Sequence, residues 1–337
     1  MKTSISTQSF SKQPICLIGN LNIDLIIRNV PHLPVWGQEV LGTSHVQVSS
    51  GQGGYTAFAL RGLQVPTSLI GNVGDDIYGR QILADLQKKG VNTDGVTVEA
   101  GGQTGITVAI VREDGERAFV SNLGCLRSFD GSYISPQQGK IKQAGIIGLV
   151  GIFNLPGFAL LDAAKIFEEF RTAGKFTMFD SGWDPSNWPA STLENFKTLL
   201  HSVNLFMPNW DEAQAITGKN SLDDAARSLL NEGPDIVVIK GGKEGSHVFT
   251  KEEKFSLPAL PVTVYDAVGA GDTFNGGFLA GFRQGWPLDA CLALGNAAAA
   301  QYISKPTDRF PSLEDAITAA RPYGLIPTQS TTKKEVL

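Results

Sequence analysis

The sequence predicts an α/β fold: a doubly wound, mostly parallel sheet flanked by helices, with a small antiparallel β lid. Short apolar runs typical of buried parallel strands occur at 15–18, 67–70, 145–150, 176–179, 203–207 and 236–239. Helical periodicity lies between them at 55–63, 79–89, 158–171, 193–201 and 211–218. This alternation of strand and helix indicates βαβ units.

Two segments interrupt the alternation and are the expected lid. Residues 39–49 and 104–122 show the period-two pattern of strands, and neither is followed by a crossover helix. We therefore expect lid strands at about 37–50 and 103–123, over a site at the carboxyl ends of the parallel strands. The alternative is a surface hairpin without a gating role.

The remaining length fits one domain between two tails. Residues 15–325 carry the strand and helix patterns and are expected to form a single α/β domain. Residues 1–14 and 326–337 are rich in polar residues and are expected to be disordered tails. The most apolar segment, 144–161, contains a proline and four glycines, which argues against a membrane span.

Composition and charge narrow the class of protein. The chain has 337 residues, of which 42% are hydrophobic and 18% charged, as in soluble enzymes. Its net charge of −5 and its lack of a Lys or Arg run argue against nucleic acid as a partner. Cys16, Cys125 and Cys291 are widely spaced and are expected to be reduced thiols of a cytoplasmic protein. The four histidines lack metal-ligand spacing.

Segment 266–281, with the sequence DAVGAGDTFNGGFLAG, carries the strongest indication of function. Residues 261–265 are β-branched and aromatic and predict a preceding strand, and the apolar spacing after Gly271 predicts a following helix. Gly276, Gly277 and Gly281 would each cost that helix about 1 kcal/mol relative to alanine. They therefore predict close packing, most simply against the alanine-rich helix expected at 288–303, which would hold the turn rigid.

The turn itself suggests a chemistry. Gly269 and Gly271, on either side of Ala270, can direct successive N–H groups at one anion, where the helix dipole adds to the attraction. The same dipole would keep Asp272 ionised, and an ionised carboxylate beside a bound phosphate can accept a proton from an attacking hydroxyl. The pattern indicates phosphoryl transfer to an alcohol. The alternative is a tight turn in which Asp272 only caps the helix.

With these residues assembled, the chain resembles the ribokinase-like (PfkB) carbohydrate kinase family over 15–324, most specifically in 266–281, which is similar to the family's C-terminal signature. The resemblance implies that Asp272 is the catalytic base and that the turn from Gly269 to Gly271 is the anion hole for the transferred phosphoryl group. It also implies that Asp266 and the Val268 carbonyl contact a monovalent cation such as K⁺.

Two further segments resemble the sugar-binding parts of the family. Asn22 and Asp24 match an Asn-x-Asp pair that binds sugar hydroxyls, and a carboxylate can accept two adjacent hydroxyls at once. The alternative for this pair is an Asx turn after a strand.

Segment 50–57 resembles the family's N-terminal signature, in which Gly51, Gly53 and Gly54 allow close approach of the substrate. Tyr55 stands where members usually have asparagine, so it is expected either to stack on the substrate or to narrow the pocket.

The nucleotide side is implied by three matches. Asn209 and Glu212 match an Asn-x-x-Glu motif whose glutamate organises Mg²⁺ and its waters, with a capping box as the competing interpretation. Lys240 and Gly242, in the segment that ends at Gly245, would lie along the ATP phosphates, and a plain β-hairpin is the alternative for the glycines. The third match, Asn296, falls where members place a residue beside the adenine.

The sequence therefore predicts an ATP-dependent kinase that phosphorylates a hydroxymethyl group of a small sugar or polyol. One alternative is a nucleoside kinase of the same family, with Tyr55 or a tryptophan of the 180–188 loop stacked on a base. Another is a sugar-binding relative without catalysis, which has no use for Asp272. No membrane partner is expected, and the apolar faces of 40–48 and 106–120 permit a homodimer through the lid.

Overall fold

The computed structural model describes residues 10, 12–114 and 116–327, and its centre is a nine-stranded sheet in the order β13-β12-β11-β10-β9-β8-β1-β4-β5. Neighbouring strands from β5 to β11 pair in parallel, and β12 and β13 add antiparallel pairs at one edge. The strands are β1 (Ile15–Gly19), β4 (Thr67–Gly74), β5 (Asn92–Glu99), β8 (Ile146–Val150), β9 (Phe176–Asp180), β10 (Leu205–Phe206), β11 (Ile236–Lys240), β12 (Ser246–Phe249) and β13 (Lys254–Leu257).

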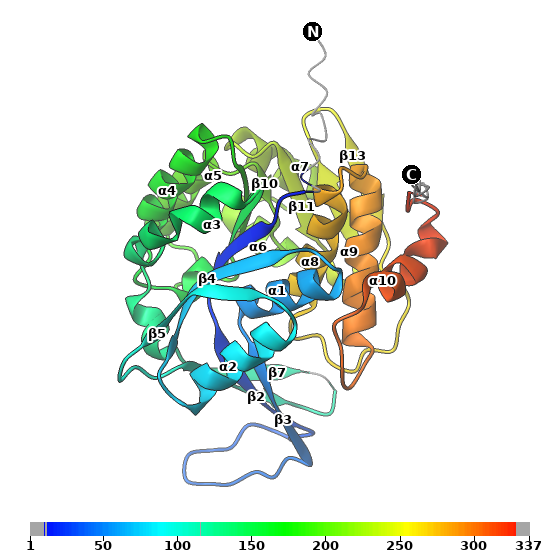
Figure 1. Ribbon diagram of the computed structural model, residues 1–337. Coiled ribbons are helices and arrows are strands. Elements are labelled where there is room, and N and C mark those ends of the chain that lie inside the picture. Colours follow the sequence, from blue (N-terminus) through cyan, green and yellow to red (C-terminus); the bar gives the residue numbers. More distant parts are fainter. Residues whose placement is uncertain (1–9, 11, 115, 328–337) are drawn as a thin grey trace, which may run out of the picture.

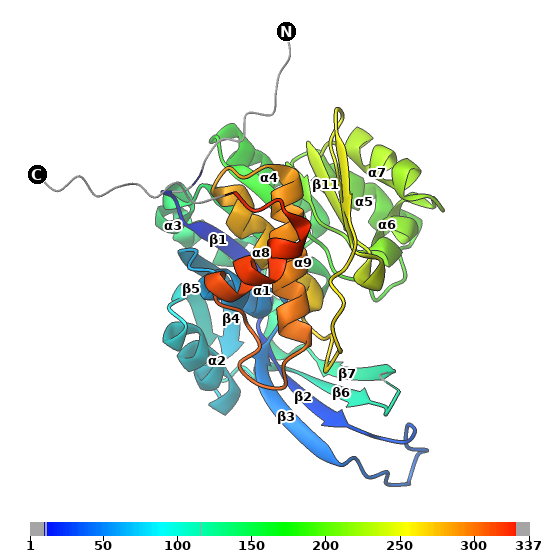
Figure 2. The same ribbon diagram turned by 90° about the vertical axis from the view of Figure 1, so that its right-hand side faces the viewer.

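Helices cover both faces of this sheet (Figures 1 and 2). In β1, Ile15 and Leu17 join one apolar cluster and Cys16 and Ile18 join another, which explains why the strand is an unbroken apolar run. The first cluster includes α1 (Gln52–Gly62), α2 (Ile77–Lys88), α8 (Ala270–Arg283), α9 (Leu288–Ile303) and α10 (Leu313–Ala320). The second includes α3 (Gln138–Gln143), α4 (Leu160–Thr172), α5 (Ala190–Leu200), α6 (Trp210–Thr217) and α7 (Leu222–Asn231).

A smaller sheet, here called the lid sheet, projects from the main body (Figure 2). Its order is β3-β2-β6-β7, from β2 (Asn22–Arg28), β3 (Ser44–Ser50), β6 (Gly105–Val111) and β7 (Arg117–Asn122). The two outer pairings are antiparallel, whereas β2 and β6 pair in parallel. Strands in both predicted lid segments are thus confirmed, and the sequence had not indicated that β2 joins them. Between β6 and β7 the sequence has Asp-Gly at 114–115, a pair typical of a tight hairpin turn, and residue 115 lies outside the described residues.

Two sequence-based expectations need correction. Residues 261–265 form no strand and are exposed, and the Tyr265 N–H donates to the Ile303 carbonyl oxygen at the end of α9 instead, at 2.8 Å. Within the predicted N-terminal tail, Phe10 is buried with its ring 5.8 Å from that of Phe176, so packed structure begins before residue 15. Most of the two predicted tails, 1–9 and 328–337, lies outside the described residues.

Close packing of α8 explains its glycines. A Cβ on Gly277 would lie 2.7 Å from the Leu294 carbonyl oxygen and 2.8 Å from Gly295 Cα, both in α9. A Cβ on Gly276 would instead lie 2.5 Å from Ala59 Cβ in α1. The predicted contact with the alanine-rich helix is confirmed, and α1 encloses α8 from a second side. The turn that precedes α8 is therefore mounted on a tightly packed helix.

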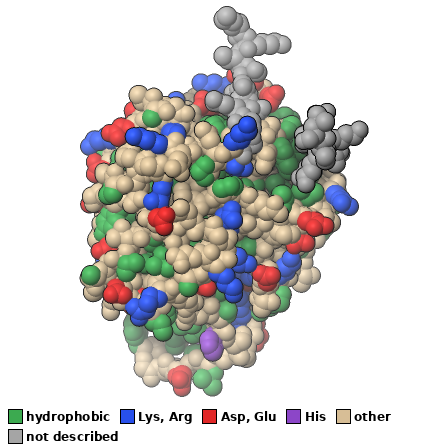
Figure 3. All heavy atoms as spheres, viewed as in Figure 1, with side chains coloured by type: hydrophobic (Ala, Val, Ile, Leu, Met, Phe, Trp, Pro, Cys, Tyr) green, Lys and Arg blue, Asp and Glu red, His purple; other side chains and the backbone are tan. Residues whose placement is uncertain are grey.

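The visible surface has no dominant charge. Figure 3 shows Lys and Arg side chains interspersed with Asp and Glu side chains over the face seen in Figure 1. Among the described helices, none combines the length and apolar character needed to cross a bilayer.

Candidate active site

Two pockets meet at one carboxylate. The first, here called the lid pocket, has a volume of about 320 Å³ and lies between the lid sheet and the starts of α1 and α8. The second, here called the lysine pocket, has a volume of about 480 Å³ and is lined by Lys240, by the start of α6 and by the start of α8. Asp272 and Gln52 line both pockets. A group bound in either pocket can therefore reach Asp272.

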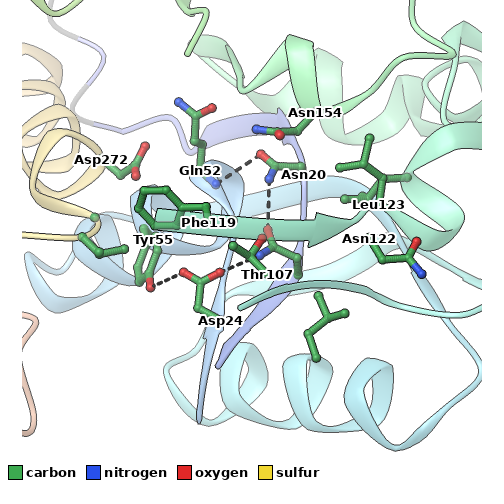
Figure 4. Close-up of a pocket in the computed structure, with 16 residues that line it drawn as sticks. Asn20, Asp24, Gln52, Tyr55, Thr107, Phe119, Asn122, Leu123, Asn154 and Asp272 are labelled. Carbon is green, nitrogen blue, oxygen red and sulfur yellow. Dashed lines mark hydrogen bonds between the residues drawn. The ribbon is translucent and has the colours of Figure 1, made fainter. Parts of the chain in front are cut away.

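A chain of polar side chains lines the lid pocket (Figure 4). Asn22 and Asp24 point to the same face of β2 because strand side chains alternate. Asn22 Nδ2 donates to Asp24 Oδ1 at 2.8 Å and to Ser50 Oγ at 2.9 Å, and its Oδ1 accepts from Asn20 Nδ2 at 3.1 Å. Burial raises the pKa of the Asp24 carboxyl, and the hydrogen bonds from Ser50, Tyr55 and Asn22 oppose that rise. The carboxylate is thus held by donors in a fixed orientation.

Tyr55 supports this site from beneath. Its hydroxyl donates to Asp24 Oδ2 at 3.0 Å, and its ring lies edge-on to Tyr302 with the ring centres 6.1 Å apart. A Cβ on Gly269 would lie 3.1 Å from Cγ of Tyr55. The ring therefore packs against the glycine turn while its hydroxyl donates to Asp24, and Tyr55 is one of the residues that line the lid pocket.

The glycine turn has the geometry of an anion site. Gly269 is the N-cap of α8 with φ of 82°, a left-handed conformation that favours glycine. Ala270 N–H donates within the turn to the Ala267 carbonyl oxygen at 3.2 Å. In the described part of the chain, the N–H groups of Gly269 and Gly271 have no such acceptor in the turn. The N–H groups of these two glycines are thus available to an anion at the positive end of the helix dipole.

Asp272 follows in the first turn of α8 and is set among other carboxylates. Burial and the negative charges of Asp180, Glu212 and Asp24 raise the pKa of its carboxyl well above the ordinary value, against the attraction of Lys240. The sequence predicted that the helix dipole keeps Asp272 ionised, but burial and the neighbouring carboxylates raise its pKa by more than the dipole lowers it. The raised pKa makes the carboxylate a stronger proton acceptor.

Lys240 is a partly buried cation beside these carboxylates. Its Nζ donates to Asp180 Oδ2 at 2.5 Å and to Asn275 Oδ1 at 3.3 Å, and Asn275 Nδ2 also donates to that Asp180 oxygen. A Cβ on Gly271 would lie 3.6 Å from Lys240 Nζ, so the ammonium group lies beside the glycine turn. The lysine pocket thus offers a positive charge and free N–H groups on one side, a combination that suits phosphate.

Glu212 lines the same pocket at the start of α6. Its N–H donates to Asn209 Oδ1 at 2.8 Å, and its Oε2 accepts from the Asn209 N–H at 2.9 Å, so the predicted capping box is confirmed. Burial and the charge of Asp180 raise the pKa of Glu212 to about 7. Glu212 thus caps α6 and lines the lysine pocket at the same time.

Comparison with known proteins identifies the family. The chain matches the model of the pfkB family carbohydrate kinases over residues 12–316. It belongs to the pfkB carbohydrate kinase family. It is 29% identical over 291 residues to a ribokinase of Bacillus subtilis, covering 85% of this chain and 91% of that protein. It is also 29% identical over 302 residues to an ATP-dependent ribose-1-phosphate kinase of Halopiger xanaduensis, covering 89% and 95%.

Solved structures show the same fold. The ribokinase of Arabidopsis thaliana, complexed with ribose and ATP, superposes with a TM-score of 0.78 at 22% identity, covering 92% of this chain and 99% of that one. The protein is thus an ATP-dependent carbohydrate kinase with the ribokinase fold.

Other predicted site residues of this pfkB kinase lie at varying distances from the pockets. Gly51 lines the lid pocket, and Gly53 packs against the Asn20 backbone. Gly54 makes only ordinary contact with Leu21 and is absent from both linings, which name described residues only. Gly242 lines the lysine pocket.

Gly245 and Asn296 have structural partners instead. Gly245 has φ of 98° where a Cβ would lie 2.0 Å from the Leu257 carbonyl oxygen, so the hairpin itself requires this glycine. Asn296 in α9 donates to the Pro258 carbonyl at 3.3 Å and to the Tyr323 hydroxyl at 3.2 Å, and it is absent from the described lining of both pockets.

The 180–188 loop follows a buried strand, and the sequence placed it where an active-site loop would lie, with its role open. Asp180, at the end of β9, lines the lysine pocket. The tryptophans of the 180–188 loop pack on each other, with ring centres 6.0 Å apart, and neither is among the described residues that line the lid pocket. The lining residues that the sequence did not indicate include Asn20, Gln52, Thr107, Arg117, Phe119, Asn122 and Asn154.

Proposed function

We propose that this kinase phosphorylates a hydroxymethyl group of a small uncharged sugar or polyol, with Asp272 as the general base. One observation carries the proposal: Asp272 lies in the wall shared by the lid pocket and the lysine pocket. A hydroxyl held in the lid pocket and a phosphoryl group held in the lysine pocket would meet at this carboxylate. Holding both reactants in line accounts for much of the rate enhancement in such reactions.

The lid pocket holds the acceptor. Asp24 accepts two adjacent hydroxyls, Asn22 orients Asp24, and the start of α1 at Gly51 allows the substrate to approach the backbone. Among the described residues that line this pocket there is no Lys, Arg or His, whereas Asp24 and Asp272 are both acidic. This balance disfavours a phosphorylated sugar, because a second phosphate would meet only carboxylates and neutral amides there.

The lysine pocket holds the phosphates of ATP. Lys240 and Gly242 lie along them, and the N–H groups of Gly269 and Gly271 stabilise the negative charge that develops on the transferred group. Asp272 takes the proton from the attacking hydroxyl. The lid sheet excludes water from the sugar, which prevents hydrolysis of ATP.

The residues present fit a magnesium ion held through water. No group of three or more His, Cys, Asp or Glu side chains within the described ranges could hold a metal ion. Glu212 and Asp180 nevertheless give the lysine pocket excess negative charge beside Lys240. Mg²⁺ usually keeps several waters and takes one or two carboxylates plus phosphates, and it neutralises phosphate charge when bound. Glu212 would orient those waters.

A nucleoside kinase is the second candidate, and one residue favours it. Phe119 of β7 lines the lid pocket and is 55% exposed, so its ring is available to stack on a base or a sugar. Tyr55 is not available in this way, because its ring is buried and its hydroxyl is bound to Asp24.

A homodimer through the lid sheet is part of the proposal. Val120 of β7 and Leu41, before β3, are 67% and 75% exposed, and burying such apolar side chains would stabilise a contact between two copies. Sedimentation should give the mass of a dimer, and Val120→Lys should give that of a monomer. A wild-type monomer would contradict the dimer.

The test of the activity is an ADP-release assay over sugars, polyols, sugar phosphates and nucleosides. We expect a neutral sugar or polyol to be the best substrate and Asp272→Asn to lower kcat by about 10²–10⁴-fold. Asp289→Asn is the matched control, because Asp289 also lies in the first turn of its helix, α9, and is outside both described pocket linings. Full turnover by Asp272→Asn, or preference for a sugar phosphate or a nucleoside, would contradict the proposal.

A further inference from the structure

Asp266, the residue before the glycine turn to which the family resemblance assigns a monovalent cation, is already bound to cations of the chain itself. Its Oδ2 pairs with Arg28 Nη2 at 2.8 Å and with Arg309 Nη1 at 3.1 Å. Its Oδ1 accepts the Val268 N–H at 2.9 Å, and its carbonyl oxygen accepts a second hydrogen bond from Arg309. The Asp266 side chain is 3% exposed, and those of Arg28 and Arg309 are 13% and 12% exposed.

These contacts do not fit a bound K⁺. An alkali cation needs oxygen lone pairs, and those of Asp266 are taken by two guanidinium groups and by backbone N–H. Two partly buried positive charges beside the carboxylate would also repel a third cation. Val268, whose carbonyl oxygen was the second expected ligand of the cation, is among the residues that line the lid pocket. Although burial raises the pKa of Asp266, the Val268 N–H and the arginines lower it overall, so the carboxylate stays ionised as their partner.

We propose that Arg309, assisted by Arg28, supplies from within the chain the positive charge that the resemblance assigns to a monovalent cation, so that the kinase works without K⁺. The inference rests on the proposed function for its activity readout. Arg309 is a positioning residue, because it acts on the glycine turn through other groups.

The route from Arg309 to the turn can be followed in the contacts. Arg309 Nε donates to the Tyr302 carbonyl oxygen at 3.1 Å, and its guanidinium carbon lies 3.9 Å from the centre of the Tyr302 ring. The Tyr302 hydroxyl lies 3.0 Å from where a Cβ on Gly269 would stand. Arg309 therefore supports the glycine turn indirectly, through its contacts with Tyr302 and with Asp266.

Arg28 adds a link to the lid. It ends β2 in the lid sheet and also lies over the Tyr265 ring, 4.9 Å from its centre. The pair between Arg28 and Asp266 thus joins the lid sheet to the segment that leads into the turn. A K⁺ ion at Asp266 could not make this connection, because it has no covalent tie to the lid.

The experiment compares wild type with Arg309→Met in buffers of constant ionic strength, with KCl replaced stepwise by tetramethylammonium chloride. We expect wild-type kcat and Tm to be the same across the series. In Arg309→Met, loss of the charge-assisted bonds should lower kcat by about 10- to 100-fold without K⁺. Added K⁺ should restore part of that loss and raise Tm, because it can bind the oxygens of Asp266 that Arg309 vacates.

Arg227→Met is the matched control, since Arg227 pairs with Asp224 on the surface of α7 and is 70% exposed. It should not acquire a response to K⁺. If Arg309→Met does not fold, Arg309→Lys keeps a charge at this position and should remain independent of K⁺.

Two outcomes would overturn the inference: activation or stabilisation of wild type by K⁺, or an Arg309→Met variant that responds to K⁺ in neither readout. The Tm series needs no substrate. Failure of the proposed activity therefore leaves the inference testable, and the two failures can be told apart.

Discussion

Replacing Tyr55 by phenylalanine isolates one hydrogen bond of the site. The hydroxyl that is lost donates to Asp24 Oδ2 at 3.0 Å, whereas Asp24 Oδ1 keeps the bond from Asn22 at 2.8 Å. The ring should stay in place, because Tyr302 and Phe310 pack against it with ring centres 6.1 Å away. The variant therefore removes a donor without opening a cavity.

The size of the effect follows from the charge on Asp24. A hydrogen bond to a charged group contributes about 1.5–3 kcal/mol, and we expect the lower end because Asp24 keeps its hydrogen bonds from Asn22 and Ser50. The free energy of unfolding should therefore fall by about 1.5 kcal/mol near neutral pH. Sugar binding should weaken about tenfold if the same bond orients the carboxylate for its ligand.

The loss of stability in Tyr55→Phe should depend on pH, in a direction that follows from the pKa of Asp24. Burial raises the pKa of Asp24, and the bond from Tyr55 opposes that rise, so Tyr55→Phe should raise the pKa further. The loss of stability is present where Asp24 is ionised in the wild type. It shrinks as the pH falls through the folded pKa toward the ordinary value of 3.8, because a protonated carboxyl no longer needs the donor.

Urea unfolding and calorimetric titration of the best sugar across a pH series measure these effects. The weakening of sugar binding at acid pH should begin at a higher pH in the variant than in the wild type. Tyr78→Phe is the control, since no hydrogen bond of the Tyr78 hydroxyl is found among the described residues. Unchanged unfolding and binding in Tyr55→Phe would refute the role given to Tyr55.

Three further predictions concern packing, metal and charge. Gly277→Ala should lower the free energy of unfolding in urea by about 1–3 kcal/mol, because its Cβ would meet the α9 backbone. Gly139→Ala, whose Cβ would meet nothing within 4 Å, should not lower it. The Mg²⁺ concentration for half-maximal rate should rise as pH falls below about 7, where Glu212 takes up a proton, and Glu212→Gln should abolish this dependence. Lys240→Met should shift the acid limb of kcat to higher pH, because Lys240 lowers the pKa values of both Asp272 and Glu212. If the acid limb of kcat did not shift, Lys240 would not control the pKa values of these carboxyl groups.

Much of the fold could be predicted because buried parallel strands and their helices leave local patterns. The helix at 288–303 has the same limits in the structure, and the apolar run that became β1 is buried on both faces. The segment 261–265 shows the limit of such patterns, since its β-branched residues form no strand and are exposed.

Part of the candidate site could likewise be predicted from the sequence, and part could not. Asp272 and its glycines lie in one continuous motif and could be found in the sequence. Asp180 could not be linked to Lys240, because their contact depends on the order of strands in the sheet and spans 60 positions. Arg28 and Asp266 are separated by 238 positions, and no pattern in the sequence pairs them. Contacts of this kind become visible only when the chain is folded.

The basicity of Asp272 depends both on the local sequence motif and on the residues that the fold brings around it. The motif places the carboxylate at a helix start, whose dipole is equivalent to roughly half a positive charge and favours ionisation. The fold adds burial and three carboxylates, Asp180, Glu212 and Asp24, which together outweigh that dipole and raise the pKa. A base that was fully ionised at low pKa would accept a proton from a hydroxyl only weakly. In the proposed mechanism, the same negative cluster therefore raises the proton affinity of the carboxylate that accepts the hydroxyl proton.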